Sequence, residues 1–388
     1  MTVAATTTPQ LRADTGQWVS SVRWDLFWMF AAVWGSALTW LAVAALGTRR
    51  AAGLLALLGM AFSVCHSWST TYAVIASPVL REARRRNRAK FTYAPIAVVA
   101  VSLALGVAVG ATGGFPQSFP LTGGQWLWVI CLALYWIGHF WHFGNQDFGV
   151  LSIYRAKAGQ TALRERRVDK AYAAAMMFAI QPCVYLKSVS HSPLSEAVFS
   201  FVPIPREAVE LAAAWAAAVA VGLTIAVCAF ELRKPNPSLP KLAYYLVMLS
   251  HPLVLFFVHW RLAFYYIAAY LWSHWLVAIG LVGRIHTNFH RAAGASPPRA
   301  LLRYVAHLGA WVAIAGAFSY AFAAFSVFSG NGRDDYKELL SGVDPRWTVV
   351  VGAIFGVFLA EQLLHYYCDR ALFRFRDPDV RRAVAPLL

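Results

Sequence analysis

The chain alternates long apolar runs with short polar and basic connections. Ten runs approach or exceed the roughly 20 residues that an α-helix needs to cross a bilayer. They cover approximately 26–46, 52–77, 92–112, 124–153, 170–188, 207–230, 239–259, 262–284, 301–327 and 347–368. The run 170–188 is the weakest, because Gln181-Pro182 interrupts it. The pattern predicts an all-α, polytopic integral membrane protein with about ten transmembrane helices in one bundle.

The basic residues predict how these helices cross the membrane. If the N-terminus lies in the cytoplasm and the runs alternate, 26 of the 34 Lys and Arg residues fall on the cytoplasmic side. Cytoplasmic loops of membrane proteins carry such an excess. We therefore expect both termini to be cytoplasmic in a multi-pass protein of the bacterial inner membrane. The expected organisation is a cytoplasmic segment 1–25, a single transmembrane domain 26–369 and a basic tail 370–388.

Composition excludes several other classes. The chain is 59% hydrophobic and 13% charged, whereas a soluble domain is about 25% charged. The net charge of +16 comes from short loops between apolar runs, so a nucleic-acid partner is not expected. The five cysteines form no CxxC pair, which argues against thiolate zinc sites. The Gly106-xxx-Gly110 spacing predicts a close contact between helices.

Histidine is the candidate chemistry, because it recurs inside the apolar runs. An ionisable group within a bilayer costs a few kcal/mol and by default marks a functional site. Imidazole is also the commonest metal ligand. The 11 histidines therefore predict a membrane-embedded metal or haem site.

The fourth apolar run carries the most specific segment. Residues three and four apart share one helix face, so His139, His142, Asn145 and Gln146 form a single stripe. Asp147 lies off the stripe, but a metal-bound histidine usually donates its second N–H to a carboxylate or carbonyl. We expect His142 to be a ligand and its neighbours to be supporting groups or alternative ligands.

Two further pairs have the i,i+4 spacing with which one helix can hold a metal. His286 and His290 form one pair, and Glu361 and His365 form the other. A carboxylate beside a histidine suits iron, which accepts mixed nitrogen and oxygen ligands. The alternatives are an exposed helix end near lipid headgroups for the first pair and a buried Glu–His hydrogen bond for the second.

The depth of each histidine in the predicted membrane topology indicates which residues could bind one metal ion. The candidates in the cytoplasmic half can supply four to six ligands to a mononuclear or dinuclear non-haem iron centre. The predicted ligands are His66, His142, His286, His290, Glu361 and His365. The residues predicted as supporting groups or alternative ligands are His139, Asn145, Gln146, Asp147, His251 and His274.

The order of three of these motifs resembles a known family. His66, then His142-Phe-Gly-Asn-Gln-Asp147, then His286-xxx-His290 is similar to the bacterial carotene-cleaving dioxygenases of the Brp/Blh type. The resemblance implies a polytopic membrane enzyme with one iron held by His66, His142, His286 and His290. The chain departs from the family around His66, where Cys65 and Ser67 stand in place of the family's Pro and Gly.

The sequence therefore predicts a membrane-embedded, histidine-ligated non-haem iron oxygenase or oxidoreductase. It would use O₂, act on a lipophilic small molecule and work among membrane lipids, with a possible redox partner. One alternative is a haem-binding electron-transfer or haem-handling protein, with one axial histidine from each of two facing helices. Another is a transporter or a structural subunit of a membrane complex.

Overall fold

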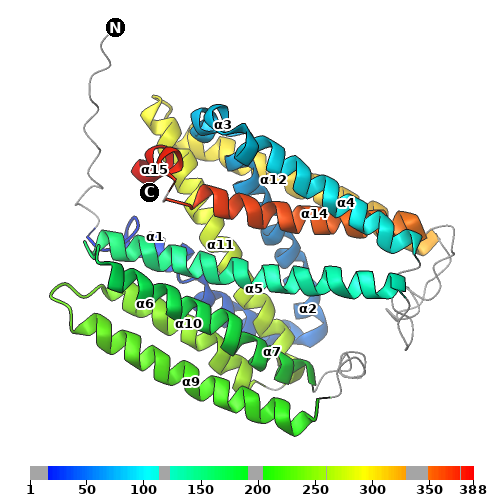
Figure 1. Cartoon of the computed structure of the whole chain (residues 1–388), viewed down its shortest axis with the longest axis horizontal. Helices are drawn as coiled ribbons and strands as arrows, with labels where there is room; N and C mark the ends of the chain where they lie inside the picture. The colour runs from blue at the N-terminus through cyan, green and yellow to red at the C-terminus, as the bar shows by residue number, and fades with distance from the viewer. Residues whose placement is uncertain (1–15, 113–122, 191–203, 259, 329–347, 376) are drawn as a thin grey trace. The chain divides into compact units, whose positions relative to one another are not determined.

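The computed structural model describes residues 16–112, 123–190, 204–258, 260–328, 348–375 and 377–388 (Figure 1). Every regular element within these residues is helical. Among the helices of these described residues, six are long and apolar enough to cross a membrane. The prediction of an all-α, multi-pass membrane protein is thus confirmed, whereas the count of ten spans and the cytoplasmic termini stay predictions.

Within the described residues, the predicted apolar runs are largely helical, and residues 259 and 347 of these runs lie outside them. The long helices are α2 (Ala31–Ile75), α4 (Ala94–Ala111), α5 (Gly123–Lys157), α9 (Arg206–Leu232), α10 (Leu239–Phe257), α11 (Trp260–Ala292), α12 (Pro297–Phe328) and α14 (Thr348–Leu372). The shorter elements are α1 (Val22–Trp28), α3 (Arg81–Arg86), α6 (Leu163–Ala174), α7 (Gln181–Ser190) and α15 (Pro378–Val384), with η2 (Pro78–Leu80), η3 (Ala89–Tyr93), η4 (Ala175–Ile180) and η6 (Ala385–Leu387).

Two runs depart from simple helices for local reasons. The runs 26–46 and 52–77 meet in α2, which is broken at Gly47, where φ is 75°. Glycine adopts this left-handed conformation without steric cost. The interrupted run 170–188 becomes α6, the π-helical turn η4 and α7, with Pro182 in the first turn of α7. Proline lacks an N–H, so it disrupts the regular hydrogen-bond ladder at this point.

The chain forms two compact units. Unit 1 consists of residues 1–63, 140–284 and 386–388, and unit 2 consists of residues 64–139 and 285–385. Unit 1 contains α6, α7, α9 and α10, whereas unit 2 contains α3, α4, α12, α14 and α15.

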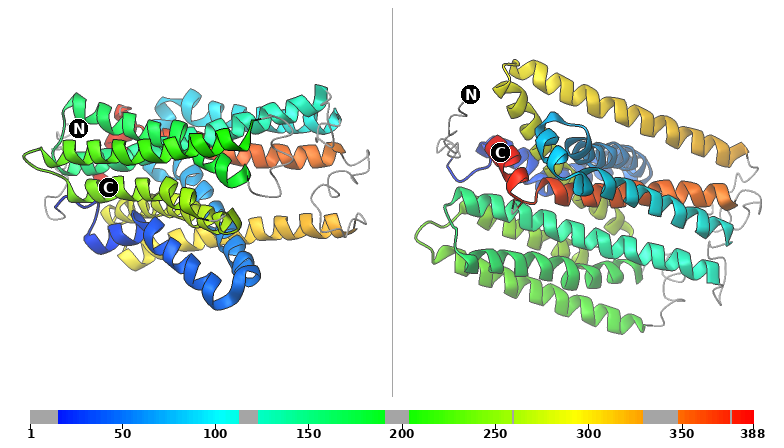
Figure 2. Two further views of the ribbon diagram at one scale, coloured as in Figure 1. Left: turned by 90° about the horizontal axis from the view of Figure 1, so that it is seen from below. Right: turned by 45° about the horizontal axis from the view of Figure 1, so that its top comes forward.

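Unit 2 is organised around the close pairing of α4 and α14. Gly106 and Gly110 of α4 face Gly352 and Gly356 of α14, and the two helices run side by side in both figures of the whole chain (Figures 1 and 2). A Cβ atom at Gly106 would lie 2.4 Å from the carbonyl oxygen of Gly352. Small residues let helix backbones approach closely within membranes, so the contact predicted from the Gly106-xxx-Gly110 spacing is confirmed.

Unit 1 is joined at one end by a buried network of charged side chains, centred on Lys241 of α10. The Lys241 ammonium lies 2.8 Å from Asp169 Oδ1 of α6 and 3.0 Å from Glu231 Oε2 of α9. All three side chains are 1% exposed. Arg155 of α5 adds a 2.7 Å ion pair to Asp169. Four helices therefore meet at one set of compensating charges.

The remaining oxygens of this network also have partners. Glu231 accepts hydrogen bonds from the Gln160 amide at 2.5 Å and from the Ser238 backbone N–H at 2.9 Å, and it pairs with Lys234 at 2.7 Å. The Tyr245 hydroxyl donates to Asp169 at 2.5 Å. A buried ion pair stabilises a structure only when its remaining hydrogen-bonding capacity is satisfied, and this network meets that condition.

Gly106→Leu is predicted to destabilise the protein by about 3 kcal/mol or more, at the upper end of overpacking costs. The new side chain would meet backbone atoms, which cannot rotate away. Gly222→Ala in α9 is the control, because nothing lies within 4 Å of its Cβ position. Thermal unfolding in detergent should show a large loss for the first variant and little change for the second; equal melting temperatures would contradict the close contact.

Lys241→Met is predicted to cost about 3–5 kcal/mol, because it leaves buried carboxylates without their shared cation. Lys170→Met, on the exposed side of α6, removes the same charge where water can solvate the remaining groups. Denaturant titration of both variants in detergent checks the prediction. If Lys241→Met unfolds at the same denaturant concentration as Lys170→Met, the network does not hold these helices together.

Candidate metal centre

Unit 2 places two histidines in direct contact. His66 of α2 and His365 of α14 are 1% and 2% exposed, and their ring centroids lie 4.1 Å apart. Thr70 Oγ1 lies 3.1 Å from His365 Nδ1, and Asp369 Oδ1 lies 3.8 Å from the same nitrogen. Thr70 follows His66 by four residues and Asp369 follows His365 by four, so helical spacing brings each supporting group to the face of its histidine.

These contacts distinguish the two ring nitrogens of His365: one faces protein groups and the other is the candidate metal ligand. In the tautomer that carries its proton on Nδ1, this N–H donates to the Thr70 hydroxyl, and the Asp369 carboxylate lies nearby at 3.8 Å. Such partners fix the tautomer and the ring orientation of a metal-binding histidine. The Nε2 atom is then the nitrogen that can ligate a metal ion.

Unit 1 contains a second histidine pair. His142 Nε2 of α5 lies 3.0 Å from His274 Nε2 of α11. The Phe143 ring stacks on the His274 ring with centroids 3.6 Å apart. The Gln146 amide donates a 2.7 Å hydrogen bond to the backbone carbonyl of His274. The stacking fixes the plane of the His274 ring, and Gln146 ties α5 to the turn of α11 that carries it.

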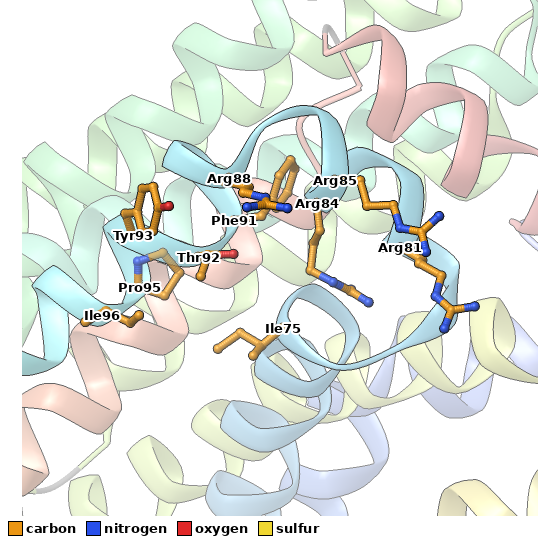
Figure 3. Close-up of a pocket in the computed structure, with 10 residues that line it drawn as sticks. All are labelled: Ile75, Arg81, Arg84, Arg85, Arg88, Phe91, Thr92, Tyr93, Pro95 and Ile96. Atoms are coloured by element: carbon orange, nitrogen blue, oxygen red, sulfur yellow. The ribbon is translucent and has the colours of Figure 1, made fainter.

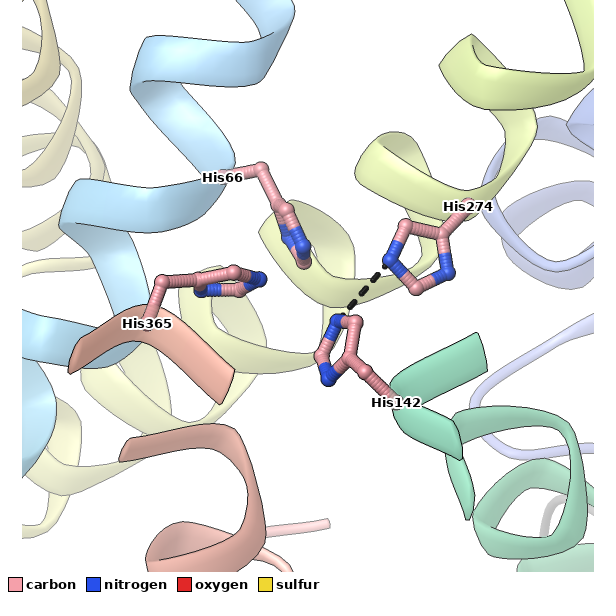
Figure 4. Close-up of side chains that lie close together, drawn as sticks. All are labelled: His66, His142, His274 and His365. Carbon is pink, nitrogen blue, oxygen red and sulfur yellow. Dashed lines mark hydrogen bonds between the residues drawn. The ribbon is translucent and has the colours of Figure 1, made fainter. Parts of the chain in front are cut away.

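Four imidazoles lie close together. One ring nitrogen from each of His66, His142, His274 and His365 lies within 4.8 Å of the others, and all four residues are buried (Figure 4). Metal–nitrogen bonds are about 2.0–2.1 Å long, so ligand nitrogens around one ion are about 3–4 Å apart. The four histidines are therefore candidate ligands of one ion. Within the described residues, no other group of three or more His, Cys, Asp or Glu residues has this arrangement.

The group includes half of the ligands predicted from sequence. His66, His142 and His365 belong to it, and His274, predicted as an alternative ligand, supplies the fourth position. His286 and His290 are not part of it; their rings lie 4.4 Å apart, and His286 lies against Tyr304. Glu361 is also outside the group, with an exposed side chain that accepts a hydrogen bond from the Gln362 amide.

The other predicted supporting residues have different contacts. His139 Nδ1 lies 3.1 Å from the Tyr366 hydroxyl, and the His251 ring stacks on Tyr270 with centroids 3.2 Å apart. Asn145 is exposed and donates to the backbone carbonyl of Trp141. Of the stripe predicted along α5, His142 and Gln146 are thus the members with contacts to His274.

Asp147 is a buried carboxylate that belongs to the same turns of α5. Its Oδ1 atom accepts a 2.7 Å hydrogen bond from the Tyr244 hydroxyl of α10, and the side chain is buried. Tyr244 lies beside Tyr154, whose hydroxyl donates to the buried Asp25 at 2.9 Å. The sequence predicted a supporting role for Asp147, and the structure shows that its hydrogen bond is to tyrosine.

His274 could not be selected from the sequence because His286 and His290 share its helix. Twelve residues separate His274 from His286, which is about 18 Å along an α-helix, so one ion can take ligands from one position or the other. The i,i+4 spacing favoured the pair at the helix end. Depth in the predicted topology placed His274 nearer the midplane than His142, so the sequence predicted His274 only as an alternative ligand.

Thr70→Val is predicted to weaken metal affinity about 10–100-fold, the usual effect of removing a partner of a metal-bound histidine. The change keeps the side-chain shape but removes the hydroxyl beside His365 Nδ1. Thr39→Val is the matched control, because Thr39 is also buried in α2 but bonds only its own helix at the Gly35 carbonyl. Competition with a calibrated chelator measures both affinities; equal values for the two variants would show that Thr70 does not orient the ring.

Comparison with known proteins returns no match: no family model, no curated protein and no solved structure is similar to this chain. The function is therefore inferred from the residues of the site and their geometry.

Proposed function

We propose that this protein is a membrane-embedded, histidine-ligated non-haem iron oxygenase or oxidoreductase that acts on a lipophilic substrate with O₂. The observation that carries the proposal is the group of four buried imidazoles with nitrogens within 4.8 Å of one another. Four neutral ligands leave positions open on a six-coordinate ion, where O₂ or substrate can bind. Two of the ligands come from α5 and α14, which are among the six apolar helices long enough to span a membrane.

Charge supports a divalent ion at this point. Two positive charges would be costly in an apolar interior unless negative groups compensate them. Asp369 lies against His365, and Asp147 follows His142 by five residues on α5; both carboxylates are buried. The histidines and the Asp369 carboxylate beside His365 suit a cation, because the imidazole ligands are neutral and the acid can supply negative charge.

The donor set favours a non-haem ion over haem. The His142 and His274 Nε2 atoms are 3.0 Å apart, which leaves no room for a macrocycle between them. Axial histidines bind haem from opposite faces of the ring. Imidazole donors suit iron, copper, zinc and nickel, so identification of the metal is part of the test.

The proposed substrate class follows from the surroundings of the site. His274 is stacked on Phe143, and Phe143 is stacked in turn near Tyr270 with centroids 6.0 Å apart. A centre carried on apolar helices with aromatic neighbours suits a substrate that arrives from the acyl-chain region. The resemblance of the His142 segment to carotene-cleaving dioxygenases supports the same class, although that family's last two ligands correspond to His286 and His290.

We also propose the finer topology that the basic residues favour. It has ten spans, both termini in the cytoplasm and a location in the bacterial inner membrane. The support is the excess of Lys and Arg in alternate loops.

Metal analysis of three purified proteins tests the proposal. Wild type is expected to contain about one iron per chain by inductively coupled plasma mass spectrometry. Its optical spectrum should show no Soret band. His274→Ala should lose most of the metal, because it removes one of the four clustered ligands. His290→Ala should keep it, because His290 lies outside the cluster.

The variants separate the two ligand sets. Loss of metal from His290→Ala with retention in His274→Ala would favour the ligands implied by the family resemblance and contradict the four-histidine centre. A Soret band in wild type would point to haem, and full-length protein without bound metal after growth in iron would overturn the proposal. Matching size-exclusion profiles of the three proteins ensure that metal loss reflects the missing ligand rather than unfolding.

A further inference from the structure

A basic pocket lies in unit 2 where the chain leaves α2, passes through α3 and η3, and enters α4 (Figure 3). Its cavity has a volume of about 570 Å³, within the range of ~300–1,000 Å³ that is typical of small-molecule sites. Arg81, Arg84, Arg85 and Arg88 contribute to its lining. Four arginines around one cavity call for an anionic occupant, because like charges repel unless a counter-charge is bound.

The basic residues of this segment fall into two classes. Arg86 pairs with Glu82 and Asp379, and Lys90 pairs with Asp377 at 2.6 Å; neither of these two cations lines the cavity. The exposed guanidinium groups of Arg81, Arg85 and Arg88, in contrast, have no ion pair or hydrogen bond with any residue that the structure describes. The segment therefore neutralises the cations that face away from the cavity and leaves those around it available.

Arg84 lines the cavity and is held in place by hydrogen bonds to the backbone. Its guanidinium donates to the backbone carbonyls of Val74 at 3.0 Å and Ser77 at 2.7 Å, at the end of α2. Burial, together with the nearby charge of Arg81, lowers the pKa of Arg84. A bound anion would relieve that repulsion. The cavity thus has one arginine anchored to the backbone and three that can turn toward a ligand.

The other wall is apolar and lies at the start of a candidate membrane span. Ile75, Tyr93 and Ile96 line the cavity and are 41%, 61% and 60% exposed. The apolar stretch that contains Tyr93 and Ile96 runs from Ala89 to Ala111. Tyrosine is enriched where a span meets the headgroup region. Charged and apolar walls therefore adjoin at the start of this candidate span.

We propose that this pocket binds the phosphate of an anionic phospholipid, with the lipid's acyl chains along Tyr93 and Ile96. Arginine suits phosphate because its planar guanidinium can donate two parallel hydrogen bonds. Basic pockets beside transmembrane helices are a common form of headgroup site. The apolar wall selects a lipid over free phosphate, because only a lipid has chains to cover Ile75, Tyr93 and Ile96. The site is independent of the four-histidine centre, so neither proposal needs the other.

Lipid titration of the full-length protein in detergent tests this site. The probes are short-chain phosphatidylglycerol, the same chain length of phosphatidylcholine, and inorganic phosphate. Wild type should bind phosphatidylglycerol saturably and at least tenfold more tightly than either of the other two. The triple variant Arg81→Ala, Arg85→Ala, Arg88→Ala should lose at least tenfold in phosphatidylglycerol affinity.

Arg166→Ala with Arg167→Ala is the control, because these two exposed arginines of α6 are outside the pocket. It should bind phosphatidylglycerol as wild type does. Ile96→Ser keeps every arginine and should weaken lipid binding while leaving phosphate binding unchanged, which covers the case in which the triple variant fails to fold. Equal affinities for phosphatidylglycerol and inorganic phosphate, or an unchanged affinity in the triple variant, would overturn the lipid assignment.

Discussion

The cost of burying polar and charged groups in an apolar interior is the constraint on which this structure depends. Unit 1 meets it with a network that balances itself: Asp169 and Glu231 share Lys241, while Arg155 and Lys234 add further positive charge at the edge. The carboxylates of that network accept hydrogen bonds as well as ion pairs. Such a network requires no ligand, and its role is to hold helices together.

The four-histidine group meets the same constraint in another way. Its rings have protein partners on their outer side, such as Thr70 for His365 and Phe143 for His274. On their inner side the nitrogens converge within 4.8 Å. The His142 and His274 rings share a 3.0 Å hydrogen bond between their Nε2 atoms, and a cation at the centre could take nitrogens from all four rings in its place. This contrast between a self-compensated network and a convergent one is the physical reason for proposing a structural role for the first and a chemical role for the second.

Close helix contacts hold two of the helices that carry the clustered histidines. The backbone contact between Gly106 and Gly352 leaves α14 little freedom to move against α4, and α14 carries His365. In unit 1 the charged network holds the end of α5, thirteen residues after His142, through Arg155. A ligand set drawn from several helices keeps its geometry only if each helix is held by contacts of its own.

The sequence alone determined the fold class. Apolar runs of this length are typical of membrane spans, and within a bilayer a helix satisfies the backbone N–H and C=O groups of each run internally. It also predicted a histidine site and named three of the four clustered histidines, His66, His142 and His365, since depth along a helix can be counted from residue numbers. The choice of His274 over His286 and His290 depended on the tertiary structure. Both positions lie on α11 about 18 Å apart, and only the packing of other helices decides which one meets His142. Glu361 follows a related logic: the i,i+4 spacing puts it on the helix face of His365, but only the tertiary structure shows that it lies outside the four-histidine group.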